Sequence, residues 1–171
     1  MDVSLRDFAD ADLPSFRGWT SNDELKQHMS RFAPHSFSSA GLVDVLTNWH
    51  VILVDGRDVG CVWIERDVAN ESVADIGIFL AADADRGHGV GRRALKLAIA
   101  AASERWRLRM IRLRVRVRNV RAIACYVTCG FELSSRGEKI VAGEKISIYE
   151  MIYRLEEMDN QQPTPTSTSR P

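Results

Sequence analysis

The chain has 171 residues and 45% of them are hydrophobic, which is enough for one globular domain with a substantial apolar core. Lysine plus arginine and aspartate plus glutamate both number 23, so net charge favours neither nucleic acid nor an anionic membrane as a partner. No apolar run is long enough to cross a bilayer, and Met1–Arg6 lacks the apolar segment of a signal peptide. We therefore expect a cytoplasmic protein.

The three cysteines suit a reducing compartment. They are odd in number and lack the spacing of a metal site, so we predict no metal. Cys125 and Cys129 stand four residues apart on one face of a predicted helix, where they serve as small apolar groups. None of the three, Cys61 included, has an evident partner that would activate it as a nucleophile.

The first third of the chain predicts a strand followed by two short helices. Residues 3–8 alternate apolar and polar side chains, as a half-buried strand does. Short polar residues of the types that cap helices then precede two helical stretches. The expected elements are a strand over 3–8, a helix capped by Asp10 or Asp12 that reaches Trp19, a helix capped by Ser21 or Asn22 that reaches about Phe32, and a loop over 33–41.

The middle of the chain predicts a meander of three strands. Two runs of β-branched or aromatic residues, 49–54 and 59–65, flank Asp55-Gly-Arg-Asp58, which is a strong hairpin signal. A second turn over 67–72 leads to a strand over 73–80. This strand ends shortly before the most informative part of the sequence.

The remaining elements complete an α+β fold with a mixed sheet. One face of the next helix carries an apolar stripe, so that face must pack on the sheet. The expected elements are a helix over 90–106 with the stripe Leu95, Ala98, Ile99, Ala102 and Trp106, a strand over 110–118, a helix over 119–129 ended by Gly130, and an antiparallel pair over 131–135 and 146–155. We assign residues 1–155 to one domain and expect 156–171, which has no apolar residue after Met158, to be a disordered tail.

A glycine-rich turn joins the strand over 73–80 to the long helix. Its sequence is Arg86-Gly-His-Gly-Val-Gly91, and alone it reads as an ordinary tight loop. The first turn of a helix, however, leaves backbone N–H groups without partners and carries partial positive charge. Glycines let an anion such as a diphosphate approach those groups closely.

A second block about thirty residues later completes a pattern. A strand ends in Asn119, a helix follows, and Gly130-Phe131 comes after it. With the glycine-rich turn, this block resembles the GNAT superfamily of acetyl-CoA-dependent N-acetyltransferases from about residue 73 to 131. The matching residues are Arg86, Gly89, Gly91, Asn119, Ala122, Tyr126, Gly130 and Phe131. The run Ile76–Leu80 with Arg86-Gly87 and Arg121-Ala122-Ile123 is most similar to the branch of ribosomal-protein N-terminal and spermidine acetyltransferases.

The resemblance implies a mostly antiparallel central sheet of about seven strands with about four helices, splayed between strands 4 and 5. Acetyl-CoA, the co-substrate, would place its thioester arm in that gap. A bulge would free main-chain N–H groups at Phe79, Leu80 and Ala81 for the arm. The implied diphosphate site consists of the turn backbone of Gly87, His88, Gly89, Val90 and Gly91, with Arg86 and Arg92 nearby. His88 itself is expected to be an exposed turn residue.

Two residues of the short helix have both structural and functional interpretations. Asn119 is a good N-cap, and the resemblance adds a contact with the acetyl-CoA arm. Tyr126 follows seven residues later, close to two helical turns, and so projects from the same face. It is either a core residue or, as in the family, the acid that protonates the CoA thiolate. We favour the acid.

The sequence leaves three candidates for the general base, namely Asp75, Glu65 and a water molecule. Relatives often carry a glutamate near the position of Asp75 that removes the amine's proton through water, but an exposed carboxylate at a strand start is an equal alternative. In one branch of ribosomal-protein alanine acetyltransferases the base is a glutamate five residues before the asparagine. This chain has Arg114 there. That role is therefore absent or moved.

Four arginines alternate with apolar residues along the strand over 110–118, so they share one face. Arg112, Arg114, Arg116 and Arg118 either form a basic strip for an acidic ligand or pair with acidic neighbours such as Glu132, Glu144 or Glu150. The zero net charge favours pairing.

The acceptor is expected to meet the N-terminal helices and the hairpin. The candidate walls are Trp19, Phe32, Trp49 and Trp63, and the candidate carboxylates for a cationic amine are Asp23, Glu24, Glu65 and Asp75. We predict an N-acetyltransferase for a primary amine, either a small amine or a protein N-terminus. The alternatives are a non-catalytic acyl-CoA-binding module and a Rossmann dinucleotide binder, which would need an acidic residue where Arg118-Asn119 stand. The oligomeric state, a homodimer included, is left open.

Overall fold

The chain folds around one seven-stranded sheet with the strand order β1-β2-β3-β4-β5-β7-β6. This arrangement comes from a computed structural model that describes residues 1–29, 31–37 and 46–155. The strands are β1 (Val3–Asp7), β2 (Thr47–Val54), β3 (Arg57–Arg66), β4 (Val73–Leu80), β5 (Met110–Arg116), β6 (Glu132–Val141) and β7 (Glu144–Arg154). The α+β prediction and its mixed, mostly antiparallel sheet are confirmed.

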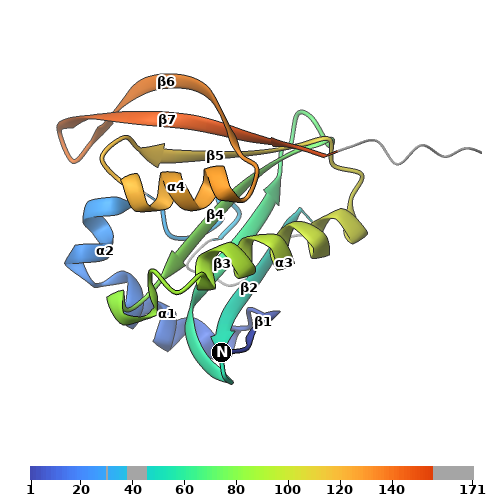
Figure 1. The fold of residues 1–171 in the computed structure, drawn as a ribbon, viewed down its shortest axis with the longest axis vertical. Helices are drawn as coiled ribbons and strands as arrows, with labels where there is room; N and C mark the ends of the chain where they lie inside the picture. The colour runs from blue at the N-terminus through green and yellow to red at the C-terminus, as the bar shows by residue number, and fades with distance from the viewer. Residues whose placement is uncertain (30, 38–45, 156–171) are drawn as a thin grey trace, which may run out of the picture.

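Helices cover both faces of the sheet (Figure 1). Apolar residues of α3 and α4 pack into one core, and those of α1 and α2 into a second core on the other face. The helices are α1 (Leu13–Thr20), α2 (Asp23–His28), α3 (Val90–Arg105) and α4 (Val120–Thr128), with short 3-10 turns η1 (Asp10–Asp12) and η2 (Asp83–Asp85). The predicted α3 stripe is confirmed, because all five of its residues are buried in the first core.

Three predicted boundaries are wrong. The second helix does not reach Phe32 but ends at His28, because Met29 has the extended backbone of φ −123° and ψ 145°. Both strands of the closing hairpin extend further toward its tip than predicted, so that β6 ends at Val141 and β7 begins at Glu144. The turn between them consists of Ala142 and Gly143, whose φ angles are +50° and +81°. The outer half of β6 is polar and resembles a loop in sequence, but cross-strand pairing with β7 holds this segment in an extended conformation. The predicted tail over 156–171 and the end of the loop over 33–41 lie outside the described residues.

The predicted caps of the first two helices differ in outcome. Asp12 occupies the N-cap position of α1, but its side chain does not cap that helix. It accepts instead from Arg6 Nη1 at 2.8 Å and from the backbone N–H of Ala9 at 2.9 Å. Asn22 does cap α2, because its side-chain oxygen accepts from the N–H of Glu24 at 2.9 Å.

The sheet opens between β4 and β5. These parallel strands pair at three positions only, from Val73 opposite Met110 to Asp75 opposite Arg112. Beyond them β5 continues as the antiparallel partner of β7, whereas Ile76–Leu80 of β4 has a strand neighbour on its β3 side only. Figure 1 shows β4 and β5 diverging from their paired ends, and α2 and α4 lie near the opening.

Gly77 of β4 provides a test of this packing. A Cβ added there would lie 2.1 Å from Cζ2 of Trp63, whose side chain is buried and has little room to move. We expect Gly77→Ala to lower the free energy of unfolding in urea by about 1–3 kcal/mol, the usual cost of overpacking. Gly137→Ala is the matched control, because no atom lies within 4 Å of a Cβ placed there. Equal stability of the two variants would contradict the close contact.

Candidate active site

A cavity of about 890 Å³ lies at the opening between β4 and β5. Its lining comes from α2, β4, the glycine-rich turn, the start of α3, β5, α4 and Lys139 and Ile148 of the β6–β7 hairpin. The cavity gathers most of the predicted site residues: Asp75, Phe79, Leu80, Arg86, Gly87, His88, Gly89, Gly91, Arg92, Asn119 and Tyr126. Ala81, Val90 and Glu65 are not part of its lining.

The glycine-rich turn has a backbone that other residues adopt only with strain. Gly87 and Gly89 have φ angles of +83° and +80°. Gly89 is the N-cap residue of α3, and no side chain caps that helix end. The first N–H groups of α3 therefore stay available beside the cavity, while the side chain of Val90 is buried in the core. His88 is exposed, as expected for a turn residue.

Arg86 fixes the turn to its surroundings. Its guanidinium donates to the carbonyl of Leu80 at 3.1 Å and to Glu24 Oε1 at 2.9 Å, so it joins the end of β4 to α2. A second ion pair, Arg121 Nη1 to Asp83 Oδ1 at 2.9 Å, joins the start of α4 to the segment before the turn. Arg92 has no hydrogen-bond partner for its side chain among the described residues. It is therefore free to meet an anion.

The expected bulge at the end of β4 is wrong for this chain. The register between β3 and β4 has no shift between the pair Gly60 and Leu80 and the pair Arg66 and Ala74. The N–H of Ala81 donates to the carbonyl of Val59 at 2.8 Å. Because antiparallel hydrogen bonds alternate along a strand, the N–H of Phe79 also faces β3, and those of Ile78 and Leu80 face the opening. The separation of β4 from β5, and not a bulge, frees these groups.

Asn119 and Tyr126 line the cavity from α4 and the residue before it. Asn119 is the predicted N-cap, with its side-chain oxygen accepting from the N–H of Ala122 at 3.3 Å. The ring of Tyr126 packs at a centroid distance of 5.9 Å from Phe131. Its hydroxyl has no hydrogen-bond partner within the described part of the chain. Burial raises the pKa of Tyr126, so the phenol keeps its proton at neutral pH.

The three thiols are unsuited to covalent catalysis. Burial raises the pKa of Cys125, which lines the cavity, to about 11. The pKa of Cys61 and of Cys129 is also raised, again chiefly by burial. A thiolate is the nucleophilic form, and these environments disfavour it.

The two predicted carboxylate bases are both engaged with cations. Asp75 lines the cavity and pairs with Arg112, with Oδ1 and Nε 3.1 Å apart. Glu65 lies outside the cavity lining and accepts from Arg31 Nη1 and from the backbone N–H of His35, each at 2.9 Å. Burial opposes ionisation of Glu65, but these hydrogen bonds outweigh it and hold its pKa below the usual range.

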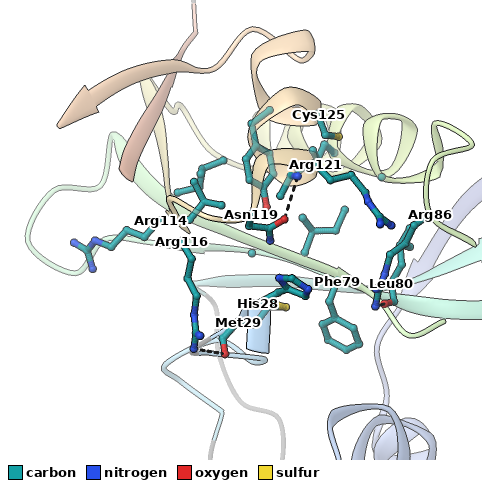
Figure 2. Close-up of a pocket in the computed structure, with 18 of the residues that line it drawn as sticks. His28, Met29, Phe79, Leu80, Arg86, Arg114, Arg116, Asn119, Arg121 and Cys125 are labelled. Carbon is teal, nitrogen blue, oxygen red and sulfur yellow. Dashed lines mark hydrogen bonds between the residues drawn. The ribbon is translucent and has the colours of Figure 1, made fainter. Parts of the chain in front are cut away.

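The arginines predicted on one strand pair only partly as expected, and Arg118 lies beyond the end of β5 at Arg116. Arg114 meets Glu150 at 3.3 Å, but Arg112 pairs with Asp67 and Asp75. Arg116 and Arg118 each donate to the carbonyl of Gln27, at 2.7 Å, and so hold the C-terminal end of α2. Figure 2 shows Arg116 reaching from the strand to Met29. The predicted partners Glu132 and Glu144 form no ion pair with these arginines in the described chain.

The predicted acceptor walls are mostly core residues. Of the four predicted aromatic residues, none lines the cavity; Trp49 and Trp63 belong to the second core, and Trp19 and Phe32 pack against it. Of the two carboxylates predicted on α2, Glu24 lines the cavity and Asp23 does not. Two further residues not predicted from the sequence, His28 and Met29, face the cavity beside Phe79 in Figure 2. Their spacing from Leu25 on α2 was the available signal.

The described residues contain neither a metal-binding cluster nor a helix suited to a membrane. No cluster of three or more histidine, cysteine, aspartate or glutamate residues in them is placed to hold a metal ion. Among their helices, none combines the length and apolarity needed to cross a bilayer.

Solved structures share this fold over almost the whole chain. Aminoglycoside acetyltransferase AAC(6')-Ib in complex with coenzyme A and kanamycin has a TM-score of 0.71 at 17% identity, covering 90% of this chain and 95% of that one. A GNAT-family acetyltransferase from Streptococcus pneumoniae has 0.68 at 20%, covering 90% and 100%. A chimera of the spermidine N-acetyltransferase SpeG from Vibrio cholerae and hSSAT has 0.72 at 18%, covering 90% and 96%.

The family assignment rests on the sequence. A search of curated protein sequences finds no match to this chain. The model of the acetyltransferase (GNAT) family matches residues 8–131, which include the glycine-rich turn, Asn119 and Tyr126. The chain belongs to the GNAT family of acetyltransferases.

Proposed function

We propose that this enzyme transfers the acetyl group of acetyl-CoA directly to a primary amine. The observation that carries the proposal is the meeting, in one cavity, of the uncapped start of α3 with the open edge of β4. The first suits a diphosphate and the second suits an extended chain of amides. CoA contains both. The neighbours solved with coenzyme A support this donor.

The proposed donor site consists of the residues predicted from the sequence, with one change. The backbone of Gly87, His88, Gly89, Val90 and Gly91 would hold the diphosphate, with Arg86 and Arg92 adding charge. The N–H groups of Ile78 and Leu80, in place of those of Phe79 and Ala81, would bind the pantetheine amides and polarise the thioester oxygen. Asn119 would contact the arm from the other side of the opening.

The proposed reaction passes through a tetrahedral intermediate and forms no covalent enzyme intermediate. The neutral amine attacks the thioester carbon, and the C–S bond breaks as the carbonyl re-forms. Asp75 takes the amine's proton through a water molecule, and Tyr126 gives its proton to the departing CoA thiolate. The unpartnered hydroxyl of Tyr126, on a residue that lines the cavity, supports its role as the acid. The place of Asp75 on β4, in the lining of the cavity, supports its role as the base.

The acceptor is proposed to be a small amine in preference to a protein N-terminus. Kanamycin and spermidine, which the names of two neighbours mention, are small amines. A non-catalytic acyl-CoA-binding module is the alternative, and release of free thiol with a panel of amines distinguishes it from the enzyme. The free cysteines agree with the proposed cytoplasmic location.

Gly89→Ala tests the diphosphate site. Alanine at a φ of +80° is strained, so the turn should distort and move its N–H groups. We expect the Kd for CoA, measured by calorimetry, to rise about tenfold. Gly143→Ala is the matched control, because its φ is +81° but it lies in the tip of the β6–β7 hairpin. A similar CoA affinity of the two variants would show that the turn does not bind the donor.

Tyr126→Phe tests the acid. Removing the hydroxyl leaves the ring contact with Phe131 but no proton for the thiolate. We expect kcat to fall about tenfold or more, with the Kd for acetyl-CoA nearly unchanged. Turnover at the wild-type rate would reject the assignment.

Asp75→Asn tests the base against a purely structural role. Asp67 shares the ion pair with Arg112, at 2.7 Å, but does not line the cavity, so Asp67→Asn is the matched control. We expect kcat at neutral pH to fall about tenfold or more in Asp75→Asn and to change less than about twofold in the control. Equal losses would mean that Asp75 only positions Arg112. A loss confined to His28→Gln would move the role to His28, whose buried Nδ1 has no hydrogen-bond partner in the part of the chain that the structure describes.

A further inference from the structure

Part of the cavity wall carries positive charge that forms no ion pair with a carboxylate of the described residues. Arg116 is only 7% exposed, and its guanidinium donates to main-chain carbonyls at the end of α2, that of Gln27 at 2.7 Å. Arg118 donates to the same carbonyl. A carbonyl satisfies a hydrogen bond but has no net charge, so both cations keep their full charge at the cavity.

Arg116 also has a donor left over. Its Nε lies buried with no hydrogen-bond partner among the described residues. A buried N–H without an acceptor is costly, and more so on a charged group. An anionic oxygen of a bound ligand would satisfy both the donor and the charge.

Two more cations extend this wall. Arg114 lines the cavity with its side chain 61% exposed, and its one hydrogen bond among the described residues joins Nε to Glu150 at 3.3 Å. Both terminal nitrogens of Arg114 are thus open to a ligand. Lys139, from β6, lines the same cavity and is exposed.

The cavity has no free carboxylate to receive a second positive charge. The acidic residues of its described lining are Glu24 and Asp75. Glu24 pairs with Arg86 at 2.9 Å, and Asp75 pairs with Arg112 at 3.1 Å. An acceptor with several cationic amines would therefore meet like charges and find no unpaired partner.

The donor does not account for the β5 cations. The phosphates of CoA would lie at the glycine-rich turn, where Arg92 and Arg121 are at hand. Figure 2 shows Arg86 and Arg121 on one side of the cavity and Arg114 and Arg116 on the other. The arginines of β5 therefore remain for the second substrate.

We infer that the acceptor is a primary amine that also carries an anionic group, as a free amino acid or an acidic peptide does. This inference rests on the proposed function, since it concerns the acceptor of the same reaction. The wall formed by Arg114, Arg116 and Arg118 binds the anionic group and leaves the amine to face the thioester. Polyamines and aminoglycosides are then poor acceptors.

The test compares acceptors that differ in charge. Thiol release from acetyl-CoA is measured with glutamate, with the dipeptides Ala-Glu and Ala-Lys, and with spermidine and kanamycin. The two dipeptides share the same N-terminal amine, and mass spectrometry of the product identifies which amine of Ala-Lys is acetylated. We expect kcat/KM for Ala-Glu to exceed that for Ala-Lys by about tenfold or more, and the ratio to shrink with added salt. The ratio of glutamate to Ala-Glu shows whether the anionic acceptor is an amino acid or a peptide.

Arg114→Glu supplies the matched variant. It should remove the preference for Ala-Glu and change the KM for acetyl-CoA less than about twofold. Arg107→Glu, an exposed arginine outside the cavity, makes the same charge change and should keep the preference. A wild-type preference for Ala-Lys, spermidine or kanamycin would overturn the inference while leaving the acetyltransferase proposal intact. Thiol release with none of these amines, anionic or cationic, would contradict the proposed function itself.

Discussion

The cavity exists because β4 and β5 stop pairing after three residues. A strand in the middle of a sheet normally has both rows of its backbone groups satisfied, and a buried unpaired N–H is costly. Here β5 stays paired with β7 on its other edge, and the edge of β4 at Ile78 and Leu80 has no strand beside it in the described chain. Arg86 donates a hydrogen bond to the carbonyl of Leu80, but the N–H groups of Ile78 and Leu80 remain available to a ligand. A ligand with amides along its length is the natural replacement for the missing strand.

The helix α2 lies at this opening and is held there by charged side chains at both of its ends. Glu24 at its start is tied by Arg86 to the end of β4, and the carbonyls at its end are tied by Arg116 and Arg118 to β5. The same arginines therefore hold the helix and charge the cavity. Removing Arg116 would disturb both, which is why Arg114 is the better position for probing recognition. The same side chains therefore contribute both to the position of α2 and to the proposed choice of substrate.

Periodicity and local signals predicted the elements whose apolar faces are regular. The α3 stripe and the hairpin at Asp55–Asp58 are clear examples, because local spacing decides them. The end of α2, the long β6–β7 tip and the partners of the β5 arginines depend on contacts between distant segments, which spacing does not encode. The family motifs predicted that the glycine-rich turn, Asn119 and Tyr126 lie close together, and all three line one cavity. The bulge expected from the family was wrong, since the opening itself frees the backbone.

The most direct measurement is an amide NMR titration of the ¹⁵N-labelled protein with CoA. The account predicts that the largest chemical-shift changes fall on the amides of Gly87 to Gly91, at the start of α3, together with those of Ile78 and Leu80 on the open edge. Saturation with the main changes on other elements, or no change at millimolar CoA, would contradict a donor site built from this turn and this strand edge.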